Sequence, residues 1–338
     1  MTLRASITQT IAGTRTTELA NAVDALTARY RSGIPAGSPI LSREIDVLAY
    51  TAYRMPATYA ATRAVFEQLH DVVPDLRPGS LVDLGAGTGA TAWAALDVWP
   101  DLTSLTMLEQ SDAAIAVGRR IAENSDATPL LAASWRQWHL GQTQPLDPAD
   151  IAVAAYVLGE LITEQQSLLV ETLARTASTV VLVEPGTPAG YARIITARNE
   201  LIARGLNVLA PCPHSLQCPL LARDGDWCHF AERLERSSTH RSVKSAELSY
   251  EDEKYAYVAA GRAARPGATG RRPARILRHP TLRKGLVSLQ LCTEEGSAVE
   301  LKVAKSEGEP YKRARRARWG DPWPPPEHPA GSSTLSPP

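Results

Sequence analysis

The stretch that most constrains the fold of this chain runs from Leu81 to Ala90 and reads LVDLGAGTGA. An apolar run comes first, three glycines alternate with small residues, and a helical pattern follows. Glycine lets the backbone turn sharply and lets a ligand approach closely. The free N–H groups of a helix N-terminus attract polar or anionic groups. The stretch therefore predicts a buried strand, a tight turn able to bind a ligand, and the start of a helix.

The spacing of the glycines separates this turn from a dinucleotide-binding turn. Gly85, Gly87 and Gly89 follow the pattern G-x-G-x-G, whereas the dinucleotide pattern is G-x-G-x-x-G. Asp83 stands two residues before the first glycine, where a carboxylate can order the turn and meet a cationic ligand. The turn resembles motif I of the class I S-adenosylmethionine (SAM) methyltransferases, which implies a nucleoside pocket. A glycine turn without a ligand is the alternative interpretation.

Strand and helix signals alternate after this turn. Alternation of this kind predicts an α/β fold with a doubly wound parallel sheet, here a Rossmann-like sheet. Strands are expected at 80–84, 102–108, 129–134, 151–156 and 179–183, with helices at 90–98, 112–121, 164–176 and 191–204. Glu109 ends the second strand, about 20 residues past the last glycine, where a carboxylate can accept hydrogen bonds from ribose hydroxyls. Ligands bind at the carboxyl ends of parallel strands, so Glu109 and the glycine turn predict one site; a surface acid is the alternative.

The sequence divides into four regions. Helical spacing predicts an N-terminal helical cap within 1–75, with helices at 16–30 and 41–73, Ser42 as an N-cap and an interruption at Met55-Pro56. Residues 76–205 form the expected Rossmann-like SAM-binding core. Residues 206–320 are expected to hold a cysteine-rich insertion, a basic β extension and late strands at 254–262, 285–292 and 298–303. Two late strands are expected to extend the sheet as an antiparallel pair, with a basic loop at 265–284. Residues 321–338 form an expected disordered tail.

Four cysteines provide the second chemical signal, in the spacing C-x5-C-x9-C-x63-C: Cys212, Cys218, Cys228 and Cys292. A zinc ribbon has two C-x2-C pairs, so this is another kind of site. In a cytosolic protein, four cysteines favour a metal over disulfides. Four thiolates suit either zinc or an iron–sulfur cluster, and His214 and His229 offer alternative zinc ligands. Free cysteines that fill the core are the remaining interpretation.

The formal net charge of zero hides an asymmetry. Residues 261–320 contain 15 Lys or Arg and 5 Asp or Glu, which gives +10, whereas residues 1–260 carry −8. A basic block is the electrostatic footprint of an anionic partner such as nucleic acid, although it can also be a solvated face. No apolar run is long enough to cross a membrane, and 1–17 lacks the apolar core of a signal peptide, so a cytoplasmic location is expected.

Together these parts resemble one family, the methyltransferase-like proteins of the mitochondrial small ribosomal subunit and their bacterial relatives. The resemblance covers about residues 41–325. The matching stretches are YRMPATY at 53–59, the glycine turn, VEPGTP at 183–188, CPH at 212–214, CP at 218–219, DWCHF at 226–230, LQLC at 289–292 and ARWGD at 317–321. The resemblance implies a role in small-subunit assembly, contact with small-subunit rRNA, and a [4Fe–4S] cluster on all four cysteines. Residues 1–17 do not resemble the family's mitochondrial targeting peptide, so a bacterial protein is expected. The oligomeric state is left open, with a monomer favoured.

The sequence offers no residue that can be assigned as the catalytic group of a methyltransferase. The place after the fourth strand holds Ala155 to Glu160 instead of an Asn-Pro-Pro-Tyr-like motif. Glu160 and Glu184 are expected near the cleft, but solvated or structural roles suit them at least as well as catalysis. Transfer to a hydroxyl or an amine needs mainly positioning, so activity stays open. The alternatives to a ribosome-assembly factor are therefore an active SAM-dependent RNA methyltransferase and a zinc-containing small-molecule methyltransferase.

Overall fold

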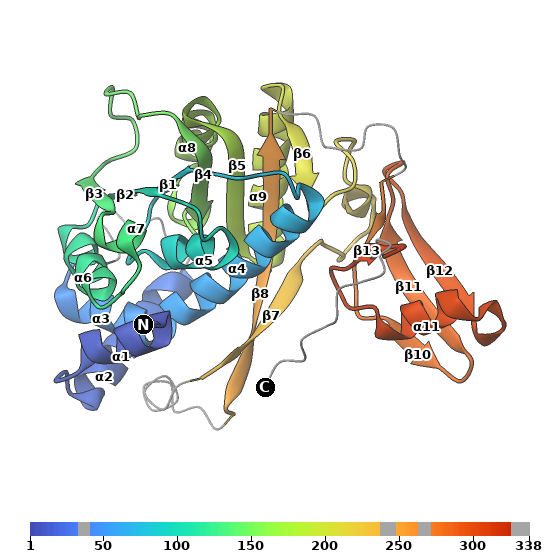
Figure 1. Ribbon diagram of the computed structural model, residues 1–338, viewed down its shortest axis with the longest axis horizontal. Helices are drawn as coiled ribbons and strands as arrows, with labels where there is room; N and C mark the ends of the chain where they lie inside the picture. The colour runs from blue at the N-terminus through green and yellow to red at the C-terminus, as the bar shows by residue number, and fades with distance from the viewer. Residues whose placement is uncertain (33–40, 237–247, 263–271, 326–338) are drawn as a thin grey trace. The chain divides into compact units, whose positions relative to one another are not determined.

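The computed structural model describes residues 1–32, 41–236, 248–262 and 272–325 (Figure 1). The chain divides into two compact units. The first comprises Met1–Ala210 and His229–Pro266, and the second comprises Pro211–Cys228 and Gly267–Pro338. Each unit is built around a sheet of its own.

The first unit contains an eight-stranded sheet in the order β3-β2-β1-β4-β5-β8-β6, with β7 paired to β8. Strands β1 to β5 are parallel, and β8 runs antiparallel to β5, β6 and β7. The strands are β1 (Ser80–Leu84), β2 (Ser104–Glu109), β3 (Ser134–Gln137), β4 (Ala149–Ala155), β5 (Ala177–Pro185), β6 (Asn207–Ala210), β7 (Phe230–Glu235) and β8 (Tyr250–Gly261). This confirms the predicted Rossmann-like sheet, in which the order of the strands reverses between β1 and β4.

Helices supply the crossovers that parallel strands require. The helices are α1 (Leu3–Ile11), α2 (Thr16–Ser32), α3 (Glu44–Tyr53), α4 (Met55–Val72), α5 (Ala90–Val98), α6 (Asp112–Glu123), α7 (Thr128–Leu131), α8 (Thr163–Thr176) and α9 (Pro188–Ala203), with a 3-10 turn η1 (Leu158–Glu160). Residues of β4 such as Ile151 and Val153 are fully buried, as expected for a parallel sheet covered by helices on both faces.

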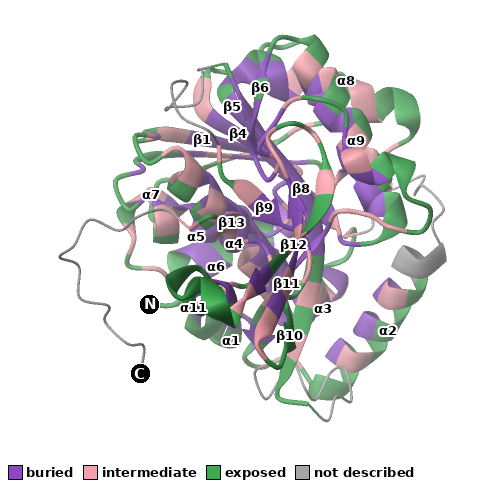
Figure 2. Cartoon of the chain, turned by 90° about the vertical axis from the view of Figure 1, so that its right-hand side faces the viewer, coloured by how far each residue is buried: buried purple, intermediate pink, exposed green. Residues whose placement is uncertain are grey.

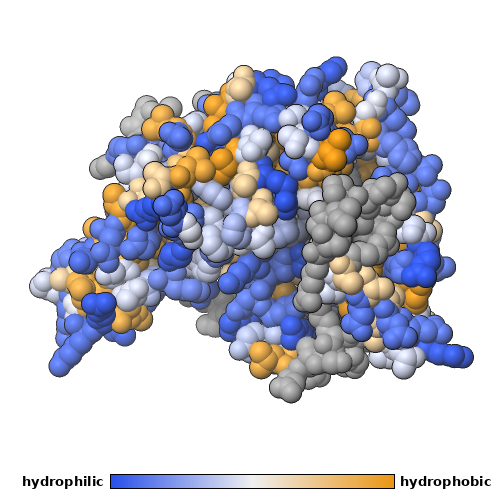
Figure 3. Space-filling model, turned by 180° about the vertical axis from the view of Figure 1, so that it is seen from behind, coloured by the Kyte–Doolittle hydropathy of each residue, from blue (hydrophilic) through white to orange (hydrophobic). Residues whose placement is uncertain are grey.

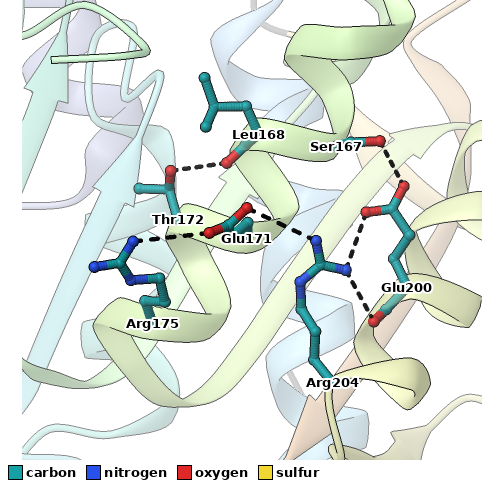
Figure 4. A network of polar contacts seen from close by, with 7 residues as sticks. All are labelled: Ser167, Leu168, Glu171, Thr172, Arg175, Glu200 and Arg204. Atoms are coloured by element: carbon teal, nitrogen blue, oxygen red, sulfur yellow. Dashed lines mark hydrogen bonds and ion pairs between the residues drawn. The ribbon is translucent and has the colours of Figure 1, made fainter. Parts of the chain in front are cut away.

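Helices α8 and α9 are joined by a polar network (Figure 4). Ser167 Oγ donates to Glu200 Oε1 at 2.7 Å, and Arg204 forms ion pairs with Glu171 at 4.0 Å and with Glu200 at 3.3 Å. The two helices that follow β4 and β5 are thereby held together.

Several details of the first unit differ from the sequence predictions, which also did not include strands β6 and β7. The strand expected at 129–134 begins only at Ser134, because Pro129 starts the short helix α7. Arg43, not Ser42, is the N-cap of α3, and its guanidinium bonds the Asp46 carboxylate at 2.8 and 2.7 Å. Helix α1 was not predicted from its weak pattern. The break between α3 and α4 at Met55-Pro56 is confirmed.

The second unit contains a five-stranded sheet in the order β10-β11-β9-β13, with β12 paired to β11. Its elements are η2 (Pro219–Ala222), β9 (Ala274–Ile276), β10 (Thr281–Arg283), β11 (Leu286–Cys292), β12 (Ala298–Ala304), η3 (Lys305–Glu307), α11 (Glu309–Arg316) and β13 (Pro322–Trp323). A small apolar core joins one face of this sheet to Ala314 of α11: Ile276, Val287, Leu289, Leu291 and Val303. Figure 2 shows the outer side of α11 exposed.

Successive side chains of a strand point to opposite faces of its sheet, so α11 and Cys292 lie on opposite faces of this sheet. Leu291 lies in the core with α11. Its neighbour Cys292 therefore faces the other way, and its register partner is Ala298. Arg275 is paired with both Cys292 and Pro322, so it shares the face of Cys292.

The late strands correct the expected layout. Strand β8 extends the large sheet antiparallel to β5, but β11 and β12 pair with each other in the separate sheet. The segment 265–284, expected to be a basic loop, contains β9 and β10, and its residues 265–271 lie outside the described ranges. The expected disordered tail 321–338 includes β13; residues 326–338 are not described.

Candidate functional site

The glycine turn lies at the carboxyl end of β1, as predicted. Gly85, Gly87 and Gly89 have φ angles of 82°, 54° and 88°, a region that favours glycine. Gly89 is the N-cap of α5. A Cβ atom on Gly85 would lie 2.5 Å from Val157 Cγ2, so a larger residue would push the segment after β4 away from the turn.

Glu109 joins this turn directly. Its Oε2 accepts a hydrogen bond from Gly87 N at 2.9 Å, and its Oε1 accepts one from Ser111 N at 2.9 Å. The side chain is buried. The structure thus brings Glu109 to the glycine turn, as the sequence predicted. It also shows a second role, because the carboxylate closes the turn through backbone amides.

Asp83 is buried beneath the turn, with 1% of its surface exposed. Neither carboxylate oxygen has a hydrogen-bond partner of normal geometry within the described part of the chain. Burial raises the pKa of Asp83 to about 7; the Glu109 carboxylate adds to the rise, and the nearby Thr91 hydroxyl opposes it. A buried, unpartnered carboxyl group is costly unless a ligand or counter-ion satisfies it.

Two further residues shape the turn and were missed in the sequence. The Trp135 ring on β3 lies 3.0 Å from the position of a Cβ on Gly89, and it leaves no room for a Cβ on Gly118. Val157 contacts Gly85. Gly118 in the middle of α6 was an available signal, because an isolated glycine in a helix often marks a close approach.

Glu184 has a structural partner at the end of β5. Its Oε2 accepts a hydrogen bond from Arg193 Nε at 2.7 Å, and its side chain is 1% exposed. Burial raises its pKa, while Arg193 opposes the rise. The structure therefore supports the structural interpretation of this residue.

All four cysteines belong to the second unit. Cys212, Cys218 and Cys228 lie in the segment 211–228, here called the cysteine loop, and Cys292 ends β11. None forms a disulfide, and Cys218 and Cys292 are buried. Burial raises the pKa of Cys228 well above its usual value, and the charges of the other three cysteines raise it further, whereas Arg278 lowers it. The four thiols therefore share one electrostatic neighbourhood.

The histidines divide differently from the cysteines. His214 Nε2 lies 3.4 Å from Cys292 Sγ, so it neighbours the thiols. His229 belongs to the first unit. Within the described residues, no group of three or more His, Cys, Asp or Glu side chains is arranged to hold a metal ion. The fit to a metal group rests on the donor chemistry: repulsion among close thiolates is relieved by a cation, and metal binding is coupled to thiol deprotonation.

Three arginines spaced three apart fix the cysteine loop. Arg272 donates to Pro213 O at 3.3 Å, and the buried Arg275 donates to Pro211 O at 3.2 Å and also to Gly320 O. Arg278 donates to Trp227 O at 3.0 Å and pairs with Asp226. Arginines that the sequence placed in a general basic block therefore hold carbonyl groups beside Cys212 and Cys228.

The outer basic residues lie on α11. Lys312, Arg313, Arg315 and Arg316 are exposed, while Ala314 is fully buried. The Trp319 ring packs edge-on against His279, with ring centres 5.0 Å apart. This tryptophan thus packs within its own unit.

A cavity of about 300 Å³ occurs elsewhere in the first unit, between α1, α4 and β7. Its charged residues are largely paired with one another, as Arg63 with Glu67 at 2.7 Å. No residue predicted to be functional lines it. Figure 3 shows a largely hydrophilic surface with scattered apolar residues on the view from behind. No described helix combines the length and apolar character needed to cross a membrane.

Comparison with known proteins identifies relatives. The chain is 29% identical over 291 residues to "Ribosome assembly protein METTL17, mitochondrial" of Homo sapiens; the match covers 81% of this chain and 61% of that protein. Among solved structures, a putative RNA methyltransferase from Pyrococcus horikoshii matches with 13% identity and a TM-score of 0.41, over 71% of this chain and 99% of that one. Magnesium protoporphyrin IX methyltransferase from Synechocystis matches with 13% identity and a TM-score of 0.40, over 70% and 91%.

A family model covers most of the chain. The model described as "Mitochondrial small ribosomal subunit Rsm22" matches residues 44–324, which include the glycine turn and all four cysteines. The chain therefore belongs to the Rsm22 family.

Proposed function

We propose that this chain is an assembly factor of the small ribosomal subunit that holds a [4Fe–4S] cluster on its four cysteines and binds rRNA through its second unit. The observation that carries the proposal is the build of that unit. Cys292 and exposed α11 lie on opposite faces of one small sheet. A ligand group bound by the cysteines would brace a sheet whose other face carries a cationic helix.

The donor set supports the cluster. Cys212, Cys218, Cys228 and Cys292 would hold it as thiolates, and a four-cysteine set is the usual protein ligand set for such clusters. When bound, the cluster would cross-link the cysteine loop to β11 through these thiolates. Zinc is the alternative occupant of four thiolates.

The chemistry of α11 supports rRNA as the partner. Its four basic side chains are exposed on a helix that presents Ala314, its small apolar residue, to the core. Arginine and lysine contact phosphates, and counter-ion release makes such binding depend on salt. The family and the human relative are both named for a ribosomal role, which favours rRNA over other polyanions.

Metal analysis tests the cluster. In full-length protein purified without oxygen, we expect iron and acid-labile sulfide of about four each per chain, with a brown colour. Cys292→Ser should lose this content, whereas Ser288→Ala, on the same face of β11, should keep it. One zinc and no sulfide would replace the cluster by a zinc site and favour a zinc-containing methyltransferase. Protein without any metal would overturn the proposal.

Filter binding tests the RNA partner. Replacing Arg315, Arg316 and Arg318 by Gln should weaken binding to a small-subunit rRNA fragment and lower the slope of log K against log salt by about 2. Arg15, Arg175 and Arg233 are exposed arginines of the first unit. Their triple Gln variant is the matched control and should bind as the parent does. Equal binding by both triple variants would contradict a role for α11 and for Arg318, which follows it.

A second candidate function, an active SAM-dependent RNA methyltransferase, is favoured by Asp83. Neither of its buried carboxylate oxygens has a hydrogen-bond partner of normal geometry among the described residues, and SAM carries positive charge. Asp83, the three glycines and Glu109 would hold SAM, which supplies the methyl group. Calorimetry should detect SAM binding that Gly87→Arg abolishes, and methyl incorporation into rRNA would establish the enzyme. Folded protein that binds no SAM would remove this candidate.

A cytoplasmic location stays a prediction that cell fractionation tests.

A further inference from the structure

The segment after β4 begins with a residue of unusual backbone geometry, Tyr156. Tyr156 has a φ of 62°, the one positive value of a non-glycine residue within the described ranges. Such a backbone conformation is strained for a residue with a side chain and persists only where the surrounding contacts hold it. The next residue, Val157, contacts Gly85 of the glycine turn. Whatever holds Tyr156 therefore also holds the wall of the candidate nucleoside site.

Two side chains from distant parts of the sequence hold Tyr156. Its hydroxyl donates to Glu253 Oε1 on β8 at 2.8 Å. Arg54, at the junction of α3 and α4, forms two hydrogen bonds with the same carboxylate, at 2.9 and 2.7 Å. The Arg54 guanidinium also stacks over the Tyr156 ring, 4.7 Å from its centre. These three residues are here called the Arg54 latch.

The latch is well suited to fix a conformation. The Arg54 and Glu253 side chains are 25% and 12% exposed, so their paired hydrogen bonds are largely shielded from water. Two parallel bonds between a guanidinium and a carboxylate define direction as well as distance. Burial and the charge of Glu253 raise the pKa of Tyr156 well above its usual value, so the phenol stays a donor. The backbone adds a bond from Tyr156 N to Val183 O at 2.7 Å.

We infer that Arg54, Tyr156 and Glu253 are positioning residues for the nucleoside ligand: they lock the 156–161 turn so that Val157 packs on Gly85 and completes the SAM-binding wall. The inference rests on the proposed SAM site. It also assigns a role to the stretch YRMPATY at 53–59, whose arginine bonds Glu253 on β8. A preformed wall lowers the cost of ordering the site when ligand binds.

The experiment combines two readouts on the full-length protein. Hydrogen exchange without ligand reports whether the latch orders the 156–161 turn, and calorimetry with SAM reports whether that order matters for binding. The variants are Glu253→Gln, which removes the paired bonds, and Tyr156→Phe, which removes one hydroxyl and leaves the Arg54–Glu253 pair. Asp252→Asn is the matched control, because Asp252 is the preceding residue of β8 and pairs with Arg233 at 2.7 Å at the surface.

We expect Glu253→Gln to speed exchange of the 156–161 amides about tenfold and to weaken SAM binding about five- to tenfold, with unchanged exchange in β11 and β12. Tyr156→Phe should show smaller changes in the same direction, and Asp252→Asn none. Unchanged exchange in both latch variants would overturn the latch. Faster exchange with unchanged SAM affinity would overturn its role in binding. Absence of SAM binding in the parent protein would overturn the proposed SAM site itself, and with it the ligand role of the latch.

Discussion

At the scale of single residues, the buried carboxylate of Asp83 lowers the free energy of unfolding but would favour binding of the positively charged SAM. The group is buried without a hydrogen-bond partner in the described part of the chain, and its pKa is raised to about 7. An unfolded aspartate titrates near a pKa of about 3.9. Between these two pH values the folded state holds a proton that the unfolded state has lost. The contribution of Asp83 to the free energy of unfolding therefore falls as pH rises from about 4 to 7 and is lowest above 7.

Asp83→Asn should remove this pH dependence. In ligand-free protein, we expect the variant to gain up to about 4 kcal/mol over the parent at pH 8, and the gain should shrink toward zero near pH 4. The same change should weaken SAM binding, because an amide cannot offset a positive charge. Melting temperature at pH 5 and 8, with and without SAM, measures both effects. A stability gain that is equal at both pH values would contradict the assignment.

The glycines of the turn could be predicted from the sequence because a tight turn with positive φ angles requires glycine at those positions. Gly85, Gly87 and Glu109 could be assigned from spacing alone, since a tight turn between strand and helix leaves few choices. Val157 and Tyr156 could not, because their contacts join segments that lie far apart in sequence, as Val157 and Gly85 do. The positive φ of Tyr156 depends on Arg54 and Glu253, which no local pattern connects to it.

At the scale of elements, strands and helices with strong periodicity were predicted within a few residues, as at 80–84 and 164–176. The failures have physical causes. Strands β9 and β10 have three residues each, too few for a period to show. The partners of β11 and β12 are decided by tertiary packing, so sequence could not tell a separate sheet from an extension of the large one.

Arg275 on β9 connects the cysteine loop to the turn after α11 through its hydrogen bonds. Its guanidinium donates to Pro211 O and to Gly320 O, and a lysine cannot supply both directed bonds. Arg275→Lys should therefore destabilise the second unit by about 2 kcal/mol, because a buried carbonyl loses its donor. Faster hydrogen exchange across 211–228 measures the effect. Arg283→Lys on exposed β10 is the control and should leave exchange unchanged; equal exchange in both variants would show that Arg275 is not the link.

At the scale of the whole molecule, the chain contains two units with very different means of support. The first has an eight-stranded sheet covered by helices, whereas the apolar cluster beneath α11 in the second holds six buried residues, with Leu220 and Leu277 buried besides. A core that small is usually supplemented by a metal or by disulfides. The four cysteines form no disulfide, so a bound metal group is the supplement that their chemistry offers.

Loss of that group should therefore unfold the second unit and leave the first intact. We expect Cys292→Ser to raise hydrogen exchange of β11 and β12 toward that of an unfolded chain, because structural metal binding and folding are one equilibrium. Exchange in β1 and β4 should stay at the parent's level, since both strands lie in the core of the first unit. Ser288→Ala, which keeps all four thiols, is the matched control. Protection retained in β11 despite loss of metal would show that the small core suffices alone, and loss in both sheets together would show that the two units fold as one.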